Sequence, residues 1–177
     1  MGVLPDHLQP GLRVVFVGTA VGLRSAQVGG YYAGPGNEFW GTLHQVGLIP
    51  VPLGPHLSER VLEFGIGLTD LAKDVSASSD RGLRALYDVP GFVAKIERFR
   101  PAWVAFHGKE AGRTASKALG HGNHVSLGVQ PWTIGDPQVF VCPSMSGANR
   151  DPARLEGKPS REAWFAELAG LLPRGQD

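Results

Sequence analysis

The acidic side chains on candidate site loops are the first groups to consider for chemistry. There are five of them, namely Glu38, Asp70, Asp74, Asp136 and Asp151. Glu38 falls in the first turn of an expected helix, where favourable interaction with the helix dipole accounts for a carboxylate without a catalytic role. Asp136 and Asp151 are ordinary turn residues. Asp70 follows an apolar stretch, so its carboxylate is expected to be desolvated at a cleft. Asp70 is therefore the main candidate, with bracing of the next loop as the alternative role and Asp74 in reserve.

The stretch GTAVGLRS at residues 18–25 follows a short apolar run and has the form of a ligand-binding turn. Between its two glycines it offers one hydroxyl, that of Thr19, and two apolar side chains, Ala20 and Val21. We expect its backbone N–H groups, rather than its side chains, to stabilise negative charge that develops on a ligand.

Metal and cofactor chemistry finds little support in the sequence. Cys142 lies in an apolar run and is most simply a small buried residue, and the histidines show no zinc-ligand spacing with it. His107 ends an expected strand near the cleft, where a hydrogen-bonded core histidine is the favoured interpretation. We expect no metal and no cofactor.

The elements that must position these groups alternate along the chain. Strands are expected at 13–17, 102–108, 130–135 and 137–144, and helices at 38–47, 58–64, 88–101, 109–119 and 160–172. Residues 65–72 are ambiguous between strand and turn, and we place Asp70 at or just after a strand end.

This alternation predicts an α/β protein, a three-layer α/β/α sandwich around a central, mainly parallel sheet. Ligands of such sheets bind beyond the carboxyl ends of the strands. Three groups of loops should therefore converge, namely 18–37, 67–75, and 107–109 together with 142–150.

Length and composition are those of an ordinary globular chain. The 177 residues suit one domain, 1–177. The net charge is only +1, but the segment at 147–161 is locally basic. A solvated loop is the alternative explanation of that segment. A single cysteine and the absence of long apolar runs predict a cytoplasmic protein without membrane association. A monomer is also expected, because the chain is small.

Four motifs in order carry a family resemblance. They are GLRVVFVGTAVGLRSA at 11–26, YYAGPGNEFW at 31–40, GIGLTDLA at 65–72 and VCPSMSGANR at 141–150. Together they resemble the mismatch-specific uracil DNA glycosylase and thymine DNA glycosylase family within the uracil-DNA glycosylase superfamily. The likeness spans about residues 11–170.

The resemblance implies a monofunctional DNA glycosylase of base excision repair. Such an enzyme would hydrolyse the N-glycosidic bond of uracil, or of another deaminated or damaged base, flipped out of DNA. In the family an asparagine of the first motif positions the attacking water, and here Ala20 occupies that position. We therefore assign the catalytic role to Asp70, since a carboxylate can stabilise the positively charged sugar and orient the water.

The resemblance also implies a base pocket. Gly18, Thr19 and Ala20 would shape it, Tyr32 would stack on the flipped base, and Asn37 would contact the edge of the base. Structural burial is the alternative for Tyr32. A helix N-cap is the alternative for Asn37.

The last motif matches a loop that enters the DNA minor groove. The expected DNA contacts are Lys109, Ser144, Ser146, Gly147, Ala148, Asn149 and Arg150. Family members often carry a bulky wedge where Ala148 stands, so we expect weak discrimination of the opposite base. The DNA would be duplex with uracil or a mismatch, or single-stranded. A plain surface lysine is the alternative for Lys109.

Two other classes of function stay open at this point. The chain would be a catalytically impaired module that binds damaged DNA if the loss of asparagine abolishes hydrolysis. It would be a Rossmann-like nucleotide enzyme if the first turn bound phosphate. The stretch GTAVG lacks the G-x-G-x-x-G spacing, however, and no acidic ribose contact is evident about 20 residues later.

Overall fold

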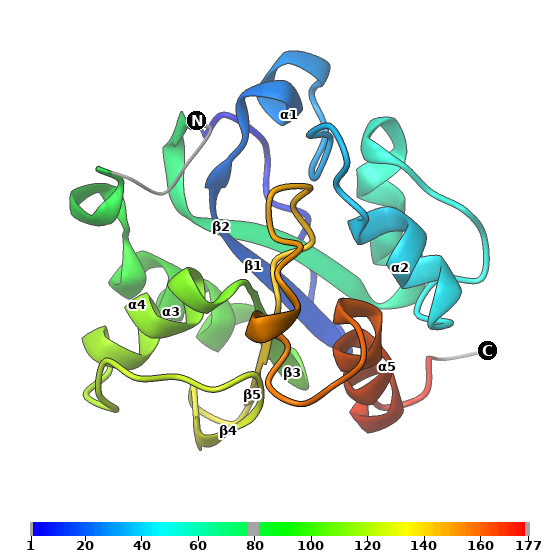
Figure 1. Ribbon diagram of the computed structural model, residues 1–177. Helices are drawn as coiled ribbons and strands as arrows, with labels where there is room; N and C mark the ends of the chain where they lie inside the picture. The colour runs from blue at the N-terminus through cyan, green and yellow to red at the C-terminus, as the bar shows by residue number, and fades with distance from the viewer. Residues whose placement is uncertain (1, 78–81, 176–177) are drawn as a thin grey trace.

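A five-stranded sheet forms the centre of the computed structural model, which describes residues 2–77 and 82–175 (Figure 1). Its strands are β1 (Val14–Val21), β2 (Ile66–Ser76), β3 (Trp103–His107), β4 (Gly128–Thr133) and β5 (Gln138–Cys142). The strand order is β2-β1-β3-β5-β4, with the antiparallel β4 at one edge and the other neighbours parallel. The predicted mainly parallel α/β sheet is confirmed.

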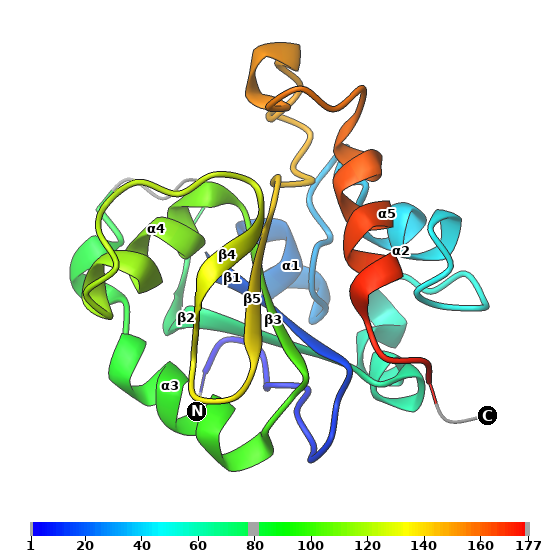
Figure 2. The same cartoon turned by 90° about the horizontal axis from the view of Figure 1, so that it is seen from below.

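Helices cover both faces of this sheet, as Figure 2 shows. The α-helices are α1 (Leu23–Val28), α2 (Phe39–Gln45), α3 (Val89–Phe99), α4 (Lys109–Ala118) and α5 (Arg161–Leu171), and the 3₁₀ helices are η1 (Pro55–Phe64), η2 (Arg84–Leu86) and η3 (Pro152–Arg154). No helix within the described ranges has the length and apolar character needed to cross a membrane.

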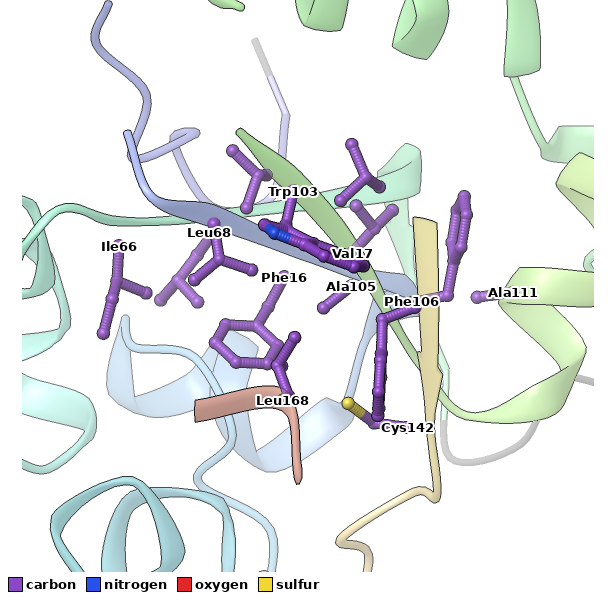
Figure 3. Packing of buried hydrophobic residues seen from close by; sticks show 14 of the residues in the cluster. Phe16, Val17, Ile66, Leu68, Trp103, Ala105, Phe106, Ala111, Cys142 and Leu168 are labelled. Atoms are coloured by element: carbon purple, nitrogen blue, oxygen red, sulfur yellow. The ribbon is translucent and has the colours of Figure 1, made fainter. Parts of the chain in front are cut away.

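Aromatic side chains show which helices cover which face. Phe16 of β1 packs against Phe39 of α2 and Phe165 of α5, with ring centroids 5.2 and 6.0 Å apart. On the opposite face Phe106 of β3 lies 5.7 Å from Phe92 of α3. Figure 3 shows part of this core, including Phe16 and Leu168 of α5. Because side chains alternate along a strand, each face of the sheet has its own layer of helices.

The strands that lead to the cleft are longer than the sequence predicts. β1 continues past Gly18 to Val21, and β2 continues to Ser76, so Asp70 lies within a strand and not at its end. β1 pairs with β3 from Val14 to Val17, whereas its pairing with β2 continues to Val21 across a bulge. The stretch after Gly18 is therefore strand, followed by the short helix α1, which the sequence did not predict.

A segment near the start of the chain runs along the outer edge of β2. His7 and Leu68 exchange two backbone hydrogen bonds of 2.9 and 3.0 Å, and the N–H of Val3 donates to the carbonyl of Lys73 at 2.8 Å. This segment supplies hydrogen-bond partners that an edge strand otherwise lacks.

Candidate active site

A large cavity of about 1090 Å³ opens where β1, β3 and β5 end. Eleven of the predicted site residues line it, namely Gly18, Thr19, Ala20, Tyr32, Asn37, Asp70, Lys109, Ser144, Ser146, Ala148 and Asn149. Gly147 and Arg150 do not line it but belong to the same loop. The three predicted segments converge at this cavity, but 67–75, which contributes Asp70, belongs to strand β2 and not to a loop. The orange segment after β5 reaches the loop after α1 in Figure 1.

Asp70 reaches the cavity because β1 has no side chain opposite it. Gly18 is the paired residue of Asp70, and a Cβ on Gly18 would lie 2.5 Å from Asp70 Oδ1. Ala20 pairs with Ala72 two residues further along, so both pairs face the same side of the sheet. The small residues of β1 leave room for the carboxylate of β2.

The carboxylate of Asp70 is almost completely enclosed. Its side chain is 4% exposed, and within the described residues Oδ2 has no hydrogen-bond partner, with Lys73 Nζ 3.8 Å away. Burial raises the pKa of Asp70 to about 6, and the positive charge of Lys73 opposes this rise. A group with this pKa is mainly ionised at neutral pH and has unused capacity to accept hydrogen bonds.

Tyr32 forms one wall of the cavity within a cluster of rings. Its ring centroid lies 3.9 Å from that of Phe39 and 4.7 Å from that of His107. Its hydroxyl is buried without a hydrogen-bond partner within the described residues, and burial raises its pKa. The backbone has φ of 57°, a left-handed conformation that costs a residue other than glycine roughly 1–3 kcal/mol. Such strain is typical of functional sites.

His107 is hydrogen-bonded, as the sequence interpretation favours, but it is half-buried and also lines the cavity. The backbone N–H of Met145 donates to its Nε2 at 3.0 Å. Burial, with the charge of Arg161 as a second cause, lowers the pKa of His107 to about 3. The imidazole is therefore neutral at physiological pH, and it fixes the start of the loop after β5.

The loop at residues 143–150, here called the rim loop, is anchored by a buried arginine. Arg161, at the start of α5, donates to the carbonyls of Ser144 and Ser146 at 3.0 and 2.8 Å. It also pairs with Glu38 at 2.8 Å while its own side chain is 7% exposed. Glu38 is the N-cap of α2, where a helix dipole favours a carboxylate, and through this ion pair it also joins α2 to the rim loop.

Glycine and arginine complete the anchoring of the rim loop. A Cβ on Gly147 would lie 2.7 Å from the carbonyl oxygen of Pro35, so the two loops touch through their backbones. Arg150 contacts Glu38 Oε1 and the carbonyl of Gly36, both at 3.3 Å. Ala148 stays exposed at the mouth of the cavity.

Two other predicted residues, Asn37 and Lys109, already have intramolecular contacts, and the reserve candidate Asp74 lies elsewhere. Asn37 Oδ1 accepts a hydrogen bond of 3.0 Å from the N–H of Phe39, but the N-cap of α2 is Glu38 and not Asn37. Asn37 also lines the cavity. Lys109 Nζ lies 2.8 Å from Glu156 Oε2. Asp74 is exposed and lines a separate small cavity, so the reserve candidate is away from the main one.

Within residues 2–77 and 82–175 there is no group of three or more histidine, cysteine or acidic side chains that would hold a metal ion. Cys142 is buried, and burial raises the pKa of its thiol. The residues that line the main cavity offer three carboxylates, those of Asp70, Glu110 and Glu156, together with basic side chains, hydroxyls, amides and backbone N–H groups.

Comparisons with known proteins agree with this architecture. The chain is similar in structure to the solution NMR structure of a proposed uracil DNA glycosylase from Methanosarcina acetivorans, at 22% identity and a TM-score of 0.54, over 94% of this chain and 95% of that one. This likeness supports the fold. A family model described as the uracil DNA glycosylase superfamily matches residues 5–169. The chain therefore belongs to the uracil DNA glycosylase superfamily.

Proposed function

We propose that this protein is a monofunctional DNA glycosylase of base excision repair that hydrolyses the N-glycosidic bond of uracil in DNA through Asp70. Membership in the superfamily supports a DNA glycosylase type of activity with DNA as the partner. The observation that carries the assignment is the buried carboxylate of Asp70, which lies over Gly18 in the cavity beside Ala20. The four motifs favour the mismatch-specific and thymine DNA glycosylase branch.

The reaction needs charge of both signs to be stabilised. Loss of the base leaves positive charge on the deoxyribose, which an ionised carboxylate stabilises, and the same carboxylate orients a water toward the anomeric carbon. Negative charge on the departing base is stabilised by N–H donors. Since Ala20 has no polar side chain, we assign this role to Asp70, the carboxylate paired with β1. The other two carboxylates that line the cavity, Glu110 and Glu156, form ion pairs with Arg113 and Lys109.

The rest of the cavity suits a flipped nucleotide. Tyr32 offers an aromatic ring, worth roughly 1–3 kcal/mol for a stacked base, and the side-chain amide of Asn37 reads the edge of the base. The rim loop, with Lys109, holds the DNA backbone. Because Ala148 fills little of the gap in the duplex, single strands and easily opened pairs are the better substrates.

The direct test uses DNA oligonucleotides with one uracil, hypoxanthine, xanthine or thymine, both single-stranded and opposite each base. Abasic products are revealed by alkaline cleavage after incubation with the purified protein. We expect cleavage of uracil substrates, faster in single strands than in stable pairs. No cleavage above the protein-free control on any of these bases contradicts the enzymatic function.

The second candidate is a binding module that flips the damaged base without hydrolysis. The residue that favours it is Ala20, which stands where the family carries its asparagine. In that case uracil-containing DNA binds more tightly than the matched normal DNA, while no abasic product forms and Asp70→Asn changes neither result. Binding and cleavage measured on the same oligonucleotides separate the two functions.

A further inference from the structure

Four charged side chains, one of them the proposed catalytic carboxylate, form a chain of ion pairs. They are Asp6 from the segment along the edge of β2, Asp70 and Lys73 from β2, and Lys95 from α3. Lys73 Nζ lies 3.0 Å from Asp6 Oδ1 and 3.8 Å from Asp70 Oδ2. Lys95 Nζ lies 2.7 Å from Asp6 Oδ2. The chain of contacts alternates in sign from Lys95 to Asp70.

Besides Asp70, the ammonium group of Lys73 contacts the carboxylate of Asp6 and the hydroxyl of Tyr31. It donates to Tyr31 Oη at 3.0 Å, and the hydroxyl of Tyr31 in turn donates to the carbonyl of Pro5 at 2.9 Å. Asp6 is also fixed, because Thr69 Oγ1 donates to it at 2.6 Å. With a side chain that is only 18% exposed, Lys73 is a fixed charge and not a mobile surface lysine.

Other titratable groups face Asp70 from the remaining elements. The hydroxyls of Tyr31 and Tyr32 approach from the loop after α1, and Asp74 and Asp88 share with Asp70 the lining of a small cavity of about 80 Å³. From β1 the facing residue is the uncharged Gly18. Within the described residues, Lys73 is the one cation in ion-pair contact with Asp70.

We propose that Lys73 is a positioning residue, held by Asp6, whose fixed positive charge keeps Asp70 ionised and oriented for the reaction. This inference rests on the proposed function of Asp70. An adjacent opposite charge favours the ionised form of a buried carboxylate, which otherwise becomes protonated in an apolar site. Asp6 moderates the effect, because its negative charge offsets part of the charge of Lys73 and Lys95.

The two partners should shift the pH dependence of cleavage in opposite directions. Single-turnover rates on a uracil-containing single strand are measured from pH 4.5 to 9 for the wild type, Lys73→Met, Lys73→Arg and Asp6→Asn. The acidic midpoint moves up by about one pH unit or more in Lys73→Met, returns toward the wild type in Lys73→Arg, and moves down in Asp6→Asn. Lys117→Met, on α4 away from both cavities, is the control and leaves the midpoint unchanged.

A second readout does not depend on activity. Carbon-13 NMR of the Asp70 carboxyl follows its titration directly in the free protein, with Asp70→Asn used to assign the signal. If the wild type cleaves no substrate, the proposed function fails while this titration still tests Lys73. An unchanged Asp70 midpoint in folded Lys73→Met overturns the inference, and if that variant does not fold, Lys73→Gln is titrated with the same criterion.

Discussion

At the floor of the cavity β1 presents Gly18 and Ala20, and the residues paired with them on β2 are Asp70 and Ala72. One strand supplies space and backbone, whereas the other supplies a buried charge. In the family pattern the polar side chain stands on β1, where this chain has Ala20. Under the proposed function the catalytic group stands on the neighbouring strand, where the small residues of β1 leave room for it.

Removing the charge on β2 is the most direct test of this difference between the two strands. Asp70→Asn keeps the shape of the side chain but removes its charge, so single-turnover cleavage of uracil-containing DNA should fall by at least about tenfold to a hundredfold. Circular dichroism should show an intact fold. Near-wild-type cleavage would transfer the catalytic role to another residue.

The same variant should be more stable than the wild type at neutral pH. Burial raises the pKa of Asp70 from 3.8 to about 6, so the folded state binds its proton more tightly than the unfolded state does. The cost of the buried charge therefore grows as pH rises from about 4 to about 6. Denaturant unfolding should show Asp70→Asn more stable by roughly 1–3 kcal/mol at pH 8, with the difference shrinking at pH 4. A constant difference across this range would contradict the assigned cause.

Filling the space on β1 tests the other half of the comparison. In Gly18→Ala the new Cβ meets Asp70 Oδ1 and displaces the carboxylate, so cleavage should fall by about tenfold. Gly41→Ala in α2 is the matched control, because a Cβ there meets no atom within 4 Å and Gly41 does not line the cavity. Equal rates in the two variants would mean that the position of Asp70 over Gly18 does not matter.

The rim loop offers the smallest change and extends the comparison to another small residue. Ala148→Leu adds an apolar wedge at an exposed position, so cleavage of uracil in duplex DNA should rise by about twofold to fivefold. Cleavage in single strands should stay the same, because no gap needs filling there. An equal change in both substrates would show an effect on chemistry and not on opening the duplex.

Much of the fold and the convergence of the site loops could be predicted from the sequence. Apolar runs such as 13–17 specify buried strands, and ordered motifs placed Asp70 and Tyr32 in one cavity. The extent of β2 could not be predicted. Its residues 66–72 are buried on both faces, because helices cover them and the segment near His7 covers the edge. Such a stretch lacks the alternation that distinguishes a strand from a turn.

Contacts between distant residues account for the rest. Arg161 and Glu38 are 123 residues apart, and Asp6 lies far from Lys73 in the chain, so no local pattern links either pair. The helix α1 has six residues and no side-chain cap, which leaves little signal in its sequence. The strained backbone of Tyr32 likewise follows from tertiary packing, since a tyrosine does not favour positive φ.

The segment that runs along β2 also has a consequence for how the molecule meets copies of itself. An edge strand with open N–H and C=O groups is a template on which a second chain can add a strand and begin to aggregate. The hydrogen bonds of Val3 and His7 occupy part of that template on β2. Displacing the segment would thus expose unpaired N–H and C=O groups of β2. Sedimentation or light scattering of variants altered between residues 3 and 7 should therefore reveal self-association.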